Sequence, residues 1–253
     1  MSGVLKKLGT IASVATQAAT TLTHPLGLAK FGAYVSSIKL GKRGREEQSL
    51  PDDVQRYAVF ADSAYKSGAK RRRTQLSQLR DPNEQHNWVY DTQLSDNLTA
   101  VYASNDKVVT SFRGTKPNEF EDLAADLLLA VGSEKHSKRI KRAERKMEQI
   151  LEKYQEHGHI LAGHSLGGSI NLHLVNKYGD RIEAAHNYNP GASVSQISAS
   201  LHETQEDHPV HKVHSYHIVG DPISHINRTS EHTEVYEMLK GTANPHSIQQ
   251  FIN

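Results

Sequence analysis

The chain has 253 residues, a formal net charge of +2 and a mean hydropathy of −0.61, which suits one domain with a sizeable core. The small net charge argues against nucleic acid as the main partner. The sequence contains no run of about 18 apolar residues, so we predict no transmembrane helix. The absence of cysteine excludes disulfides, thiolate metal ligands and a cysteine nucleophile.

The first 45 residues differ in charge from the rest of the chain. They carry seven Lys and Arg residues among small and apolar ones, and no Asp or Glu. A loosely packed extension is the simplest interpretation. A basic arm that lies on an anionic membrane surface and a targeting segment are the alternatives. We therefore divide the chain into an extension over residues 1–50 and a folded domain over residues 51–253.

The predicted domain begins with a helix. Asp52 and Asp53 can cap its first turn, and the pattern ends near Gly68. Apolar residues recur in it at helical spacing, namely Val54, Tyr57, Ala58, Ala61 and Tyr65. The four basic residues at 70–73 are interpreted as a solvated loop.

Several strands are predicted from short runs rich in β-branched and aromatic residues. They cover residues 88–91, 98–103, 107–112, 182–188 and 213–219. A helix is predicted over residues 121–130, and a longer amphipathic helix over residues 134–157. The first half of the longer helix is dense in Lys and Arg, which we interpret as an exposed face. The alternation of strands and helices predicts an α/β fold with a largely parallel sheet.

The most informative stretch is Gly163-His164-Ser165-Leu166-Gly167. An apolar run precedes it and a helical pattern follows, as in the G-x-S-x-G nucleophile elbow, which holds a serine on a strained strand-to-helix turn. Side chains at Gly163 and Gly167 would clash where the strand and the helix come close. The helix that follows directs unpaired N–H groups toward an anion formed at Ser165.

A serine nucleophile needs a base and a group that orients the base. Asp221 lies in a Gly-Asp-Pro turn at the end of a predicted strand, where the Ser–Asp–His chain order of α/β hydrolases expects the orienting carboxylate. His246 follows a run that cannot be helical and is flanked by apolar residues, so it is the predicted base. His225 is the alternative base, and His232 looks like the start of a helix.

Three histidines also cluster before the elbow, at His157, His159 and His164. Neighbouring residues of a strand face opposite sides of the sheet, and no carboxylate lies beside these histidines. We therefore predict no metal site there.

Together these motifs resemble the class 3 lipase family of α/β hydrolases, the fungal triacylglycerol lipase type, over roughly residues 52–253. The matching pieces are Phe112-Arg113-Gly114-Thr115, the elbow, Asn189-Pro190-Gly191-Ala192, Gly220-Asp221-Pro222 and His246. The alternation of strands and helices already predicts helices on both faces of the sheet. The resemblance implies a lid near residues 116–121 or 131–137. It also implies that the oxyanion hole is made by backbone N–H groups of Thr115 and Leu166.

The resemblance implies a serine hydrolase that cleaves carboxylic esters of lipids through Ser165, Asp221 and His246, with an acyl-enzyme intermediate and no cofactor. Its partners would be a lipid ester and, through residues 1–45, an anionic membrane surface. A short, cysteine-free member with a basic leader suits an intracellular or virus-associated setting rather than secretion. Two alternatives stay open, a catalytically weak module that binds membranes or proteins and another acyl hydrolase, such as a thioesterase, on the same scaffold.

Overall fold

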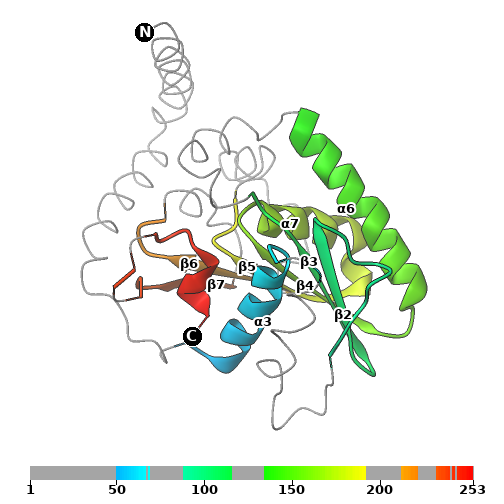
Figure 1. Ribbon diagram of the computed structural model, residues 1–253, viewed down its shortest axis with the longest axis horizontal. Coiled ribbons are helices and arrows are strands. Elements are labelled where there is room, and N and C mark those ends of the chain that lie inside the picture. The colour runs from blue at the N-terminus through cyan, green and yellow to red at the C-terminus, as the bar shows by residue number, and fades with distance from the viewer. Residues whose placement is uncertain are drawn as a thin grey trace, which may run out of the picture.

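The computed structural model describes residues 50–66, 68, 88–115, 134–191, 212–221, 232–239, 241–242 and 244–252. Within these ranges seven strands form one sheet, whose spatial order follows the chain (Figure 1). The strands are β1 (Val89–Tyr90), β2 (Thr99–Ala103), β3 (Lys107–Phe112), β4 (Gly158–His164), β5 (Ile182–Tyr188), β6 (Val213–Ile218) and β7 (His232–Tyr236).

The sheet is mostly parallel. β1, β2 and β3 pair antiparallel, and every strand from β3 to β7 runs parallel to the next. The α/β fold and the largely parallel sheet that the sequence predicts are therefore confirmed. Because β3 to β6 point the same way, the turns that follow them meet at one edge of the sheet, which we call the carboxyl edge. In open parallel sheets the ligand site lies at this edge.

The predicted strands match the observed ones to within two residues, but the segment at His232 was wrongly predicted to begin a helix. It forms β7, which pairs with β6 through contacts such as His214 with His232 and Ile218 with Tyr236. Thr233, Val235 and Tyr236 favour extended backbone, and Glu234 and Val235 are exposed on the described outer strand. Pairing with β6 outweighs the helix-start pattern of the charged residues.

Three helices among the described residues cover the two faces of the sheet. They are α3 (Asp52–Ser63), α6 (Glu134–Lys153) and α7 (Leu166–Tyr178). Figure 1 shows α3 in front of the sheet, with α6 and α7 on the opposite side. The arrangement with helices on both faces is confirmed. None of the described helices is long and apolar enough to span a bilayer.

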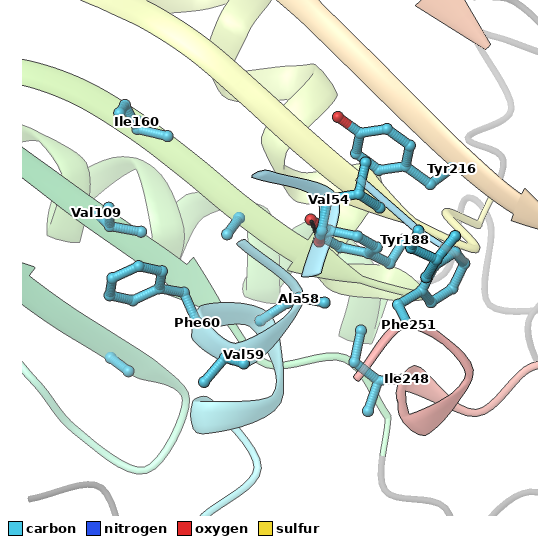
Figure 2. Packing of buried hydrophobic residues seen from close by; sticks show 14 of the residues in the cluster. Val54, Ala58, Val59, Phe60, Val109, Ile160, Tyr188, Tyr216, Ile248 and Phe251 are labelled. Atoms are coloured by element: carbon cyan, nitrogen blue, oxygen red, sulfur yellow. Dashed lines mark hydrogen bonds between the residues drawn. The ribbon is translucent and has the colours of Figure 1, made fainter. Parts of the chain in front are cut away.

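The helix α3 packs its apolar face on the centre of the sheet (Figure 2). Val54, Ala58 and Phe60 are buried there, and the Tyr188 hydroxyl donates to the Val54 carbonyl at 2.6 Å. The helix ends at Ser63 rather than near Gly68, and Tyr65 lies in the turn that follows. A short 3₁₀ helix near the end of the chain, η5 (Ile248–Phe251), packs against the same cluster.

The helices α6 and α7 fill the other face. Met147 and Leu151 of α6 and Ile170 of α7 pack in one cluster with sheet residues that include Leu161. The predicted apolar face of α6 is therefore correct. Its end lies four residues before the predicted one. There the side chains of Lys153 and the following Tyr154 bind the Asp91 carboxylate, each at 2.7 Å.

Other sequence predictions fall on residues that the structure does not describe. These are the extension over residues 1–50 apart from Leu50, the basic loop at 70–73, the helix at 121–130 and most of the expected lid.

Candidate active site

The elbow at the end of β4 holds Ser165 in a backbone conformation that favours glycine. Its φ is 57° and its ψ is −126°. Such strain costs about 1–3 kcal/mol and persists only where the surroundings enforce it. They do so here, because the Ser165 N–H donates to the Tyr188 carbonyl at 3.0 Å and the Ser165 carbonyl accepts from the Gly168 and Gly191 N–H groups at 2.9 and 3.1 Å. The strain predicted for this serine is present.

The two glycines of the elbow are required by close backbone contacts. A Cβ at Gly163 would lie 2.6 Å from the carbonyl carbon of Gly167, and a Cβ at Gly167 would lie 2.0 Å from the carbonyl oxygen of Phe112. The first contact is the predicted approach of strand and helix. The second joins the start of α7 to the end of β3, immediately before the Arg-Gly-Thr turn.

The predicted base and carboxylate are brought together from two separate turns. His246 Nδ1 lies 2.9 Å from Asp221 Oδ1, and the two residues are 0% and 1% exposed. Because a carboxylate only accepts, Nδ1 carries the proton and Nε2 is left as the basic nitrogen. Asp221 follows Gly220, whose φ of +88° makes the turn, and Asn244 Oδ1 accepts from the His246 N–H at 3.0 Å.

Asn189 fixes the relative position of these turns. It follows β5 with a φ of 42°, and its side chain bonds two other segments. Its Oδ1 accepts from the Ile218 N–H, and its Nδ2 donates to the Pro245 carbonyl, both at 2.9 Å. Asn189 was part of the motif match, but the sequence assigned it no role, since both partners are distant along the chain.

Two of the other candidate histidines, His232 and His159, lie away from the site. His232 starts β7 and so lies at the amino end of a parallel strand, opposite the carboxyl edge. His225 lies outside the described residues. His159 binds the Tyr154 carbonyl at the amino end of β4, so the three histidines before the elbow are not one cluster. Among the described residues, no group of three or more His, Cys, Asp or Glu could hold a metal ion.

The Arg-Gly-Thr turn lies beside the serine. A Cβ on Gly114 would lie 3.2 Å from Ser165 Cβ, 2.6 Å from the His164 carbonyl oxygen and 2.3 Å from the Tyr65 hydroxyl. Arg139 of α6 donates from Nη2 to the Arg113 carbonyl and so supports the turn. Thr115 comes directly after Gly114, and Leu166 is the first residue of α7, where backbone N–H groups have no partner within the helix.

Two side chains at the site were not recognised from the sequence. His164 lies between Gly163 and Ser165, with its ring centroid 4.8 Å from that of His246. Its Nε2 lies 2.6 Å from the His246 carbonyl oxygen, and its Nδ1 lies 2.9 Å from the Tyr65 hydroxyl. Burial, assisted by the charge of His246, lowers the pKa of His164 to about 3. Tyr65 had been assigned only to the apolar face of the first helix.

A family model for the Tle-like phospholipase domain matches residues 56–252. The chain belongs to this phospholipase-like family. Family membership makes it a lipase-type hydrolase of carboxylic esters, in agreement with the expected class of enzyme. Among curated proteins, none matches the chain.

Several solved lipase structures are similar to the chain. Lipase II from Rhizopus niveus is 14% identical, with 77% of this chain and 82% of that chain covered and a TM-score of 0.47. The Lip2 lipase from Yarrowia lipolytica is 14% identical, with 83% and 92% covered and a TM-score of 0.45. The triacylglycerol lipase from Penicillium expansum is 15% identical, with 77% and 80% covered and a TM-score of 0.36.

Proposed function

We propose that this lipid ester hydrolase is a phospholipase that uses Ser165 as nucleophile, His246 as base and Asp221 as the group that orients the base. The observation that carries the assignment is the buried Asp221–His246 pair, which belongs to the same carboxyl edge as the strained serine. The Ser165 hydroxyl is buried and makes no hydrogen bond to a described residue, so no such bond has to break before it attacks an ester.

The reaction follows from these positions. His246 Nε2 takes the Ser165 proton while Oγ attacks the ester carbonyl, and Asp221 holds the imidazolium that forms. The N–H groups of Thr115 and Leu166 bind the oxyanion, and each such donor typically contributes about 3 kcal/mol to transition-state stabilisation. His246 then gives the proton to the leaving alcohol, which departs and leaves the acyl-enzyme. Water, deprotonated by His246, then attacks the acyl carbonyl. The bond from this carbonyl to Ser165 Oγ breaks, His246 returns the proton to Oγ, and the fatty acid is released.

A phospholipid substrate is favoured by positive charge at the oxyanion turn. Arg139 binds the Arg113 carbonyl there, and the pKa of Arg139 is lowered by burial and by the neighbouring Arg113 charge. Two arginines beside the ester-binding turn suit a phosphodiester close to the scissile ester better than an uncharged triacylglycerol. The family model, which describes a phospholipase domain, supports the same substrate class.

The test is labelling with a fluorophosphonate probe, followed by hydrolysis of phospholipid and triacylglycerol with matched acyl chains. We expect labelling of the wild type, no labelling of the Ser165→Ala variant, and faster release of fatty acid from the phospholipid. Labelling with equal or faster hydrolysis of triacylglycerol would retain the triad and reject the phospholipid preference. Absence of labelling in the folded wild type would reject the triad.

A further inference from the structure

The elbow histidine connects the two groups that must react with each other. His164 is adjacent to Ser165 along the chain, and its side chain reaches the backbone of His246, 82 positions away, at 2.6 Å. His164 therefore links the segment of the nucleophile directly to the base. This connection holds the main chain of His246, whereas Asp221 holds its ring.

The contact with His246 fixes which nitrogen of His164 carries a proton. A carbonyl oxygen only accepts hydrogen bonds, so His164 Nε2 must donate to it. In a neutral imidazole the other nitrogen, Nδ1, then has a free lone pair. The Tyr65 hydroxyl lies 2.9 Å from Nδ1 and donates to it. The other acceptor near this hydroxyl, the His164 carbonyl, is at 3.4 Å.

The neutral state of His164 also suits the reaction. During catalysis His246 becomes an imidazolium, and a second positive ring at a centroid distance of 4.8 Å would oppose that charge. The depressed pKa of His164, about 3, keeps the ring neutral at ordinary working pH. Burial also raises the pKa of Tyr65 well above its usual range, so the phenol stays a donor.

We propose that His164 and Tyr65 form a positioning relay, in which Tyr65 fixes the tautomer of His164 and His164 holds the backbone of the catalytic base in register with Ser165. Neither residue touches the reacting atoms in this proposal, so they are positioning residues. The relay rests on the proposed function, since it assumes that Ser165 and His246 react with each other.

The test compares conservative and non-conservative variants on a soluble short-chain p-nitrophenyl ester. His164→Leu removes the donor to His246, and we expect kcat to fall about 100-fold, the cost of a small misplacement of a catalytic group, with KM within twofold. His164→Gln places an amide nitrogen near the position of Nε2, and we expect it to recover at least tenfold of that loss. Tyr65→Phe should lower kcat about tenfold, and fluorophosphonate labelling should slow in parallel.

The double variant separates the relay from two independent effects. If Tyr65 acts through His164, adding Tyr65→Phe to His164→Leu should cost less than twofold more. Fully multiplying losses would mean that Tyr65 acts through its contact with Gly114 alone, and would overturn the relay. Equal losses for the Gln and Leu variants would overturn it as well, because a packing role does not need a donor.

Tyr154→Phe is the matched control. Its hydroxyl donates to the Asp91 carboxylate at 2.7 Å, toward the amino end of β4 and away from Ser165. This variant should lower the melting temperature and leave kcat within twofold. Tyr65→Phe should instead lower kcat and change the melting temperature little. Ser165→Ala and His246→Ala are measured alongside. If those two stay active, the proposed function fails; if they are inactive while the His164 variants match the wild type, only the relay fails.

Discussion

At the scale of single residues, the strained backbone of Ser165 is expected to lower the stability of the protein, whereas its hydroxyl is expected to supply the activity. Replacement by Ala removes the hydroxyl but leaves a side chain at a φ of 57°, whereas replacement by Gly removes the strain as well. We expect both variants to lose ester hydrolysis completely. Ser165→Gly should also raise the free energy of unfolding by about 1 kcal/mol relative to Ser165→Ala. Urea denaturation of both variants measures the difference, and equal stabilities would mean that the elbow is not strained.

The base is tested by comparing three histidines that the sequence left in competition. His246→Ala should lower kcat by several orders of magnitude, because the serine loses its proton acceptor. His232→Ala should change kcat less than twofold, since His232 starts β7 at the opposite edge. His225→Ala should also have little effect. A collapse of kcat confined to His225→Ala would assign the base to that residue instead.

The residue roles that the sequence could not predict share one physical cause. Ser165 belongs to a local motif that a reader of the sequence can recognise, and Asp221 and His246 follow from chemistry and chain order. Tyr65 and Asn189 act through contacts with residues far away in the chain, and nothing in their local sequence distinguishes a polar contact from simple packing.

At the scale of elements, a stack of aromatic and histidine rings joins α3 to β5 and β6. The rings of Tyr57 and His186 lie 3.9 Å apart, and those of His186 and His214 lie 5.1 Å apart. Tyr216 forms a hydrogen bond with His186 Nδ1 at 3.0 Å. Burial, with a smaller effect of the His214 charge, lowers the pKa of His186 from 6.5 to about 3.

This depressed pKa makes the junction sensitive to acid. Below about pH 6.5 the unfolded chain binds a proton at His186, but the folded chain does not until the pH approaches 3. The stability that His186 contributes is therefore complete above pH 6.5 and decreases as the pH falls, by about 1.4 kcal/mol per pH unit. Urea denaturation between pH 6.5 and 4.5 gives the free energy of unfolding at each pH. We expect its decrease per pH unit to be smaller in His186→Gln than in the wild type, by about the amount given above. Identical slopes would mean that His186 is protonated in the folded protein.

The elements were predicted well where a periodic pattern and tertiary packing agree. The strands β3 and β5 coincide with their predicted positions, and each is a largely buried run. The start of α6 also lies at its predicted position. The strand β7 was missed because the charged residues around His232 suggested a helix start, whereas the backbone of this segment pairs with β6. The ends of α3 and α6 lie before their predicted positions.

At the scale of the whole molecule, the basic N-terminal segment is expected to direct the enzyme to its substrate. Each Lys or Arg near an anionic bilayer contributes about 1 kcal/mol to binding, and salt screens this attraction beyond roughly 8–10 Å. We propose that deletion of residues 1–45 leaves hydrolysis of a soluble ester nearly unchanged and lowers activity on anionic phospholipid vesicles. Raising the salt concentration should reduce the difference.

Co-sedimentation of the full chain and the truncated chain with anionic and zwitterionic vesicles measures this effect directly. Equal binding of the two chains to anionic vesicles would reject a membrane arm. A truncated chain that loses soluble-ester activity would indicate instead that the segment belongs to the folded domain.

The anchoring of the turns by Asn189 has a consequence for how such an enzyme can diversify. Ser165, Asp221 and His246 are tied together at the roots of their turns, through Asn189 to Ile218 and Pro245 and through Gly191 to the serine itself. Substitutions elsewhere in the domain that leave these ties in place keep the three residues in position, so new substrates can be acquired while the proposed hydrolytic chemistry is inherited intact.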